Sequence, residues 1–160
     1  TEGIHGLDLL GRKVLYNNGK GYQLFINVVE KTLAEAADIP EVAHYVPPIM
    51  EAIDRTKRVT ESLLFTIKES PDLGLANATI YLDMFGQVVM SWIWLKQALT
   101  AVRKLNQNHS EQGDSEVNFY QGKLYAAQYF ISRELPQTVQ KAALLGLNDS
   151  TCFDMCDEYF

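Results

Sequence analysis

Apolar residues recur at steps of three and four positions along most of this 160-residue chain, and this period constrains the fold more than any other feature. Such steps return to one face of an α-helix, whereas a half-buried strand needs strict alternation of polar and apolar residues. The sequence contains no alternating stretch long enough to predict a strand. We therefore expect the chain to be all-α.

Breaks in the period, at prolines, glycines and polar clusters, divide it into four long helices and several short ones. The long helices are expected at residues 22–39, 49–67, 75–105 and 115–135, the last of them stopped by Pro136. Short helices are expected at residues 7–15, 138–144 and 152–158. Short links between long helices predict an antiparallel four-helix up-and-down bundle with short additional helices at both ends.

The third long helix is apolar nearly all round, which predicts a central position in the bundle. Gly86 inside it costs about 1 kcal/mol of helix propensity relative to Ala, so we expect a neighbouring helix to approach closely there, and Gly122 is a second such candidate. Asp83 is the carboxylate expected to be buried, with a structural hydrogen bond favoured over a catalytic role. The apolar run at residues 84–95 is shorter than the roughly 20 residues that cross a bilayer, so we expect no membrane span and a cytoplasmic protein.

Composition and spacing weigh against several classes of function. The net charge is −6 and the basic residues are scattered, which disfavours binding to nucleic acid. Glu41 and His44 form one Glu-x-x-His pair, but a di-iron bundle needs two such pairs and further carboxylates, so we expect no metal site. Cys152 and Cys156, one helical turn apart, are expected to be free thiols in a reduced tail. No nucleophile elbow or phosphate-binding loop occurs, so these residues predict a bundle without a self-contained active site.

The first residues resemble a stretch of the acyl-coenzyme A dehydrogenases. That family carries Tyr-Glu-Gly-Thr-x-Gly-Ile-Gln, followed in one subgroup by a segment like Ala-Leu-Asp-Leu-Leu-Gly-Arg-Lys. Thr1, Gly3, Ile4 and the segment LDLLGRK at residues 7–13 match this pattern without a gap. The subgroup, which includes 3-methylmercaptopropionyl-coenzyme A dehydrogenase, has an additional C-terminal helical domain, and residues 81–99 and 119–136 also resemble that domain.

The resemblance implies an enzyme that desaturates an acyl-coenzyme A between its α- and β-carbons with FAD as cofactor. The family's base is the Glu of Glu-Gly-Thr, and Thr1 takes the place of that Thr, so the base is expected two residues before Thr1 and no catalytic residue within the chain. Glu2 falls at the variable position and is rejected as the base. Thr1, Glu2 and Gly3 are expected to be the remnant of a cofactor contact, while His5 replaces the family's Gln.

The resemblance also implies a division of the chain and a role for each part. Residues 1–20 would be the end of the catalytic domain, and residues 21–160 the additional helical domain with a structural and assembly role. This chain alone is expected to be inactive and to bind no FAD. The full-length enzyme would act on an acyl-coenzyme A, pass electrons to electron-transfer flavoprotein and form a homo-oligomer. The alternative is a free-standing helical module that binds a protein partner or an apolar ligand; Tyr-Glu-Gly before Thr1 would favour the dehydrogenase, and an initiator Met would favour the module.

Overall fold

A computed structural model describes residues 3–107 and 113–159, and these residues form helices and connecting turns. Helices account for every regular element of the described residues, which confirms the all-α class. The elements, in chain order, are α1 (Ile4–Asp8), the π-helical turn η1 (Leu9–Lys13), α2 (Lys20–Ala37), α3 (Pro40–Ala43), α4 (Val46–Glu69), α5 (Pro71–Leu75), α6 (Ala78–Leu105), α7 (Asp114–Tyr129), the π-helical turn η2 (Phe130–Glu134), α8 (Gln137–Gly146), α9 (Thr151–Asp154) and the 3₁₀ turn η3 (Asp157–Tyr159).

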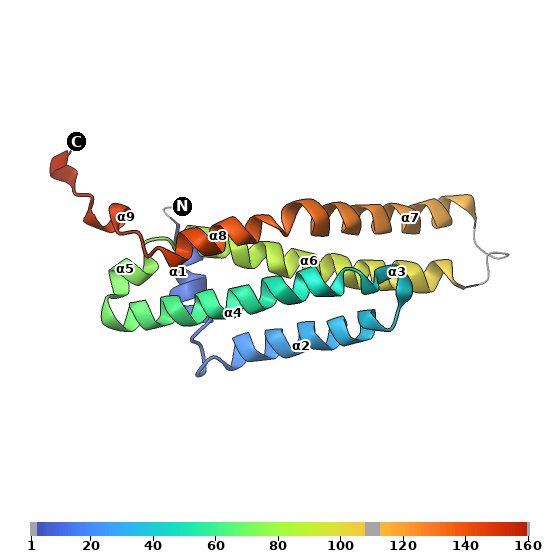
Figure 1. Ribbon diagram of the computed structural model, residues 1–160, viewed down its shortest axis with the longest axis horizontal. Helices are drawn as coiled ribbons and strands as arrows, with labels where there is room; N and C mark the ends of the chain where they lie inside the picture. The colour runs from blue at the N-terminus through green and yellow to red at the C-terminus, as the bar shows by residue number, and fades with distance from the viewer. Residues whose placement is uncertain (1–2, 108–112, 160) are drawn as a thin grey trace.

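The long helices form an antiparallel up-and-down bundle (Figure 1). α4 and α6 contact each other, α2 packs against both, and α8 packs against both from another side, while α7 lies along α6. The sequence predicts that the fourth long helix stops at Pro136, with a separate short helix from residue 138. In the structure, α8 instead begins directly after Pro136. A proline fits the first turn of a helix, where its missing N–H is not needed, so Pro136 joins two segments of one rod. The predicted bundle, with short helices at both ends, is confirmed.

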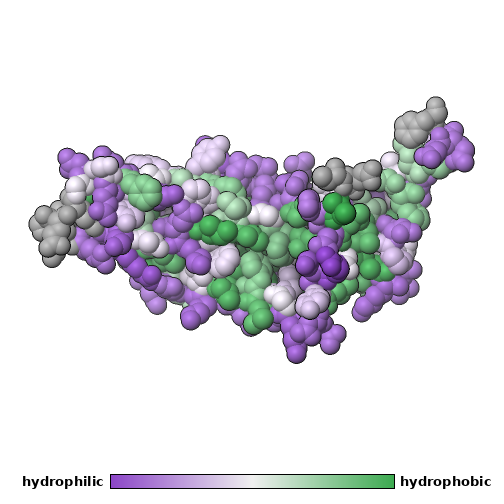
Figure 2. Space-filling model, turned by 180° about the vertical axis from the view of Figure 1, so that it is seen from behind, coloured by the Kyte–Doolittle hydropathy of each residue, from purple (hydrophilic) through white to green (hydrophobic). Residues whose placement is uncertain are grey.

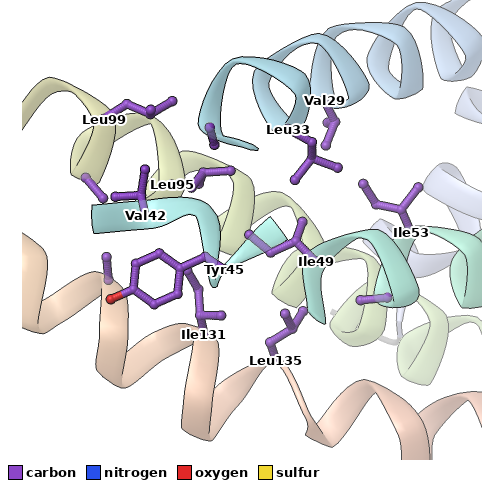
Figure 3. Close-up of a cluster of buried hydrophobic side chains, with 14 of the residues drawn as sticks. Val29, Leu33, Val42, Tyr45, Ile49, Ile53, Leu95, Leu99, Ile131 and Leu135 are labelled. Atoms are coloured by element: carbon purple, nitrogen blue, oxygen red, sulfur yellow. The ribbon is translucent and has the colours of Figure 1, made fainter. Parts of the chain in front are cut away.

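The main core lies where the stripes predicted from the sequence meet (Figure 3). Leu95 and Leu99 of α6 share this cluster with Ile49 of α4, and Leu33 of α2 and Ile131 of η2 close it from two sides. All five are nearly or completely buried. Burying one such side chain contributes about 1.5–3 kcal/mol, so this cluster holds the four rods together.

A second core cluster joins the N-terminal segment to the bundle. Leu10 and Val14 of this segment pack with Leu63 of α4 and Met84 of α6. Gly6 allows the contact, since a Cβ at this position would lie 2.5 Å from the carbonyl oxygen of Ala78. The segment is therefore packed on α6 as part of the same body, and the functional division of the chain at residue 20 stays a prediction.

Two predicted sites of close helix packing are wrong. A Cβ added to Gly86 or to Gly122 would meet no atom within 4 Å, because at both positions it would point into open space. The close approaches occur instead at Gly6 and at Gly74, whose Cβ would lie 2.5 Å from Cγ1 of Ile67. The last predicted helix is also different, since α9 ends at Asp154 and therefore does not contain Cys156. None of the helices within residues 3–107 and 113–159 combines the length and the apolarity needed to cross a bilayer.

Candidate functional site

One side of α6 is apolar although it lies away from the bundle core. Steps of three and four residues place Leu82, Gly86, Val89 and Ile93 on this side, with Met90 beside them. Leu82, Val89 and Ile93 are half-buried, and Met90 is exposed. α6 lies behind α4 in Figure 1, and Figure 2, seen from behind, shows apolar side chains gathered in the middle of that face. We call these five residues the outer strip.

The outer strip ends in a groove between α6 and α7, which we call the α6–α7 groove. Its volume is about 500 Å³, within the range of small-molecule sites. The residues that line it come from two helices and are Ile93, Lys96, Gln97 and Thr100 of α6 and Phe119, Tyr120 and Lys123 of α7. The groove therefore combines aromatic and aliphatic walls with two ammonium groups and no carboxylate.

Aromatic rings hold both groove lysines. Nζ of Lys96 lies 4.9 Å from the ring centroid of Trp92, and Nζ of Lys123 lies 5.6 Å from that of Trp94 and 5.2 Å from that of Phe119. A cation over an aromatic ring gains about 0.5–1 kcal/mol at an exposed site. In the part of the chain that the structure describes, neither ammonium group has a carboxylate within ion-pair distance. Both ammonium groups thus lie over aromatic rings and, among the described residues, outside any ion pair.

A buried polar cluster lies inside the bundle between α4 and α6. The hydroxyl of Thr60 donates to the backbone carbonyl of Thr56 at 2.7 Å, so the Tyr81 hydroxyl, 2.8 Å away, donates to Oγ1 of Thr60. Burial raises the pKa of Tyr81 and also that of Tyr22, whose hydroxyl is buried too. Both phenols stay neutral near pH 7, so this cluster is structural and offers no general base.

Of the three residues predicted to contact the cofactor, the structure describes Gly3. Thr1 and Glu2 lie outside the described residues. Gly3 is the residue before α1, with φ of 71°, and a Cβ there would lie 3.0 Å from Oγ1 of Thr79. Gly3 therefore packs against the chain's own α6. The cofactor contact at Thr1, Glu2 and Gly3 stays a prediction, and His5 is exposed on α1.

Asp83 is exposed, which contradicts the prediction that it is buried. Its side chain is 61% exposed, and its carboxylate lies 3.9 Å from Nζ of Lys141. The prediction failed because a helix that is apolar nearly all round does not reveal which of its sides faces water. Asp83 therefore has a weak surface ion pair in place of a buried hydrogen bond.

The other residues considered for metal or thiol chemistry lie on the surface. Glu41 is exposed and accepts a hydrogen bond of 3.2 Å from the side-chain amide of Asn106, while the exposed His44 ring lies 3.9 Å from that of Tyr45. Cys152 is exposed and Cys156 half-buried, and both are free thiols. Within residues 3–107 and 113–159, no three His, Cys, Asp or Glu side chains are grouped so that they could hold a metal ion.

Sequence reasoning missed the groove lysines. The signal was present, because Trp92 and Lys96, like Phe119 and Lys123, are four residues apart and so are neighbours on a helix surface. The pairing of these two surfaces depends on which sides of α6 and α7 meet. That pairing requires the three-dimensional arrangement.

Comparison with known protein families gives a match. A family described as "Acetyl-CoA dehydrogenase C-terminal like" matches residues 25–156, which cover α4 to α9 and most of α2. The match therefore includes the main core, the outer strip and the α6–α7 groove. No curated protein matches the chain significantly.

Proposed function

Because the chain belongs to the acetyl-CoA dehydrogenase C-terminal-like family, we propose that it is the additional helical domain of an FAD-dependent acyl-coenzyme A dehydrogenase. The motif at residues 1–13 supports this proposal, and it favours the subgroup that includes 3-methylmercaptopropionyl-coenzyme A dehydrogenase. In the full-length enzyme, flavin would accept a hydride from the β-carbon of the acyl thioester. The base and the flavin site belong to the catalytic part, and electron-transfer flavoprotein would be the acceptor.

The role we propose for this domain is to pack on the catalytic part and support subunit assembly in a cytoplasmic homo-oligomer. One observation carries this role: α1 has an exposed apolar side. Gly6, Leu10 and Val14 are buried against the bundle, whereas Ile4 and Leu7, three residues apart on one side of α1, are 58% and 41% exposed. Exposed apolar side chains grouped on one side of a helix are typical of an interface.

The first experiment tests the assignment and the activity of the isolated chain. The gene is sequenced upstream of Thr1, and Tyr-Glu-Gly at that place is the expected result. An initiator Met there would instead support the free-standing module. The chain alone is then titrated with FAD and assayed for reduction by an acyl-coenzyme A, with no turnover expected. Stoichiometric FAD binding with turnover would contradict the proposal that the domain is inactive alone.

The second experiment tests the interface. Leu7→Glu adds a charge to the exposed apolar side of α1, where Leu7 is 41% exposed. We expect it to lower the oligomeric state or the stability of the full-length enzyme while the isolated chain melts as before. Phe65→Glu, at a 68% exposed position of α4, is the matched control and should leave assembly unchanged. Equal effects of the two variants on assembly would argue against α1 as the interface.

A further inference from the structure

We propose that the α6–α7 groove binds a carboxylate with an unbranched alkyl chain. Its head group would be held by Lys96 and Lys123, and its chain would lie along the outer strip. This inference goes beyond the proposed function, because it needs neither a flavin nor a thioester. It rests on the charge of the groove and on the apolar outer strip that meets the groove at Ile93.

Charge favours an anionic head group. The protein carries a net charge of −6, yet the groove presents two ammonium groups and no carboxylate. The two lysines come from different helices and line the same groove, so an anion held there lies near both positively charged side chains. Charge-assisted hydrogen bonds to an ammonium are stronger than neutral ones, and at this partly open site salt will weaken them.

The apolar surface favours an alkyl chain behind that head group. Ile93 belongs both to the groove and to the outer strip, so the two apolar surfaces meet at this residue. From Ile93 to Leu82 the helix rises about 16 Å at 1.5 Å per residue. Gly86 lies in the middle of this distance and has open space where a Cβ would be. Inorganic phosphate or a nucleotide would use the groove and leave the strip uncovered.

Calorimetric titration of the 160-residue chain with octanoate and dodecanoate, below their micelle-forming concentrations, tests the proposal. Each buried methylene strengthens binding about fourfold, so dodecanoate should bind at least tenfold more tightly than octanoate. Tryptophan fluorescence should change on binding, because Trp92 and Trp94 contact the two lysines. Dodecyltrimethylammonium has the same chain with a positive head group and should bind at least tenfold more weakly than dodecanoate. Equal affinities for these two probes, or tighter binding of ADP than of dodecanoate, would overturn the proposal.

Variants separate the head-group site from the chain site. Lys96→Met and Lys123→Met keep the apolar stem and remove the charge, so each should weaken dodecanoate at least fivefold, and the double variant should lose the salt dependence. Lys31→Met, at an exposed position of α2, is the matched control. Val89→Gln should weaken dodecanoate and leave octanoate unchanged. Circular-dichroism melting establishes that each variant folds.

A further arm distinguishes a free carboxylate from a lipid surface. The chain is sedimented with vesicles of phosphatidylglycerol and titrated with dodecanoate in parallel. We expect heat from dodecanoate and little sedimentation with the vesicles. Sedimentation without any heat from dodecanoate, or a double lysine variant that binds dodecanoate as tightly as the unchanged protein, would refute the proposal.

Discussion

Replacing Gly6 with Ala should destabilise the protein, because the contact between α1 and α6 is made by backbone atoms. The added Cβ would lie 2.5 Å from the carbonyl oxygen of Ala78, 2.7 Å from its carbonyl carbon and 2.9 Å from the backbone nitrogen of Thr79. These atoms belong to the first turn of α6 and cannot rotate away as a side chain would. α1 must therefore move away from α6.

The loss of unfolding free energy caused by Gly6→Ala lies between two estimates. Overpacking of a close contact costs about 1–3 kcal/mol when the structure adjusts locally. If α1 and η1 detached completely, Leu10 and Val14 would lose their burial, at about 1.5–3 kcal/mol each. We expect a loss of about 3 kcal/mol in the free energy of unfolding, between a local shift and full detachment.

Urea unfolding followed by circular dichroism measures this loss, and two other glycines supply matched controls. Gly86→Ala and Gly122→Ala make the same chemical change in helices, but at each the new Cβ meets no atom within 4 Å. These controls should therefore gain up to about 1 kcal/mol from helix propensity. A Gly6→Ala variant within 0.5 kcal/mol of the unchanged protein, with the same unfolding slope, would refute the described packing of α1.

Three further variants test a core residue, a buried hydrogen bond and a surface ion pair. Leu95→Ala should cost about 2–5 kcal/mol in urea unfolding, because Leu95 is completely buried in the main core; a loss below 1 kcal/mol would contradict this. Tyr81→Phe should cost about 1 kcal/mol through its hydrogen bond to Thr60. Burial raises the pKa of Tyr81, so the stability of the unchanged protein should be full below the ordinary tyrosine pKa of about 10 and should fall at higher pH. This fall in stability should be smaller in the Tyr81→Phe variant. Equal pH profiles of the two proteins would contradict the burial of the Tyr81 hydroxyl. Asp83→Asn should change stability by less than about 0.5 kcal/mol, because the Asp83 carboxylate is largely exposed and lies 3.9 Å from Nζ of Lys141; a loss above 1 kcal/mol would contradict a weak surface ion pair.

The sequence predicts the bundle well because amphipathic helices show their buried side directly. In α2 and α4 the charged residues mark the water-facing side, and the predicted stripes through Leu33 and Ile49 are those that form the main core. α6 lacks such a mark, since nearly all its sides are apolar. The errors at Asp83 and Gly86 both come from this helix, because only the positions of its neighbours decide which side stays uncovered.

The same property lets α6 serve two surfaces at once. Its first turn contacts the N-terminal segment at Ala78 and Thr79, while the groove begins near Ile93 and Lys96. Along α6, Ala78 and Lys96 are about 27 Å apart at a rise of 1.5 Å per residue. A change at Gly6 should therefore disturb the surface proposed for the catalytic part without reaching the groove. Gly6→Ala can thus separate the two proposals: it should weaken assembly of the full-length enzyme and leave the affinity of the folded chain for octanoate, which stays near the groove, within twofold. A common loss of both would show that the two surfaces form one site.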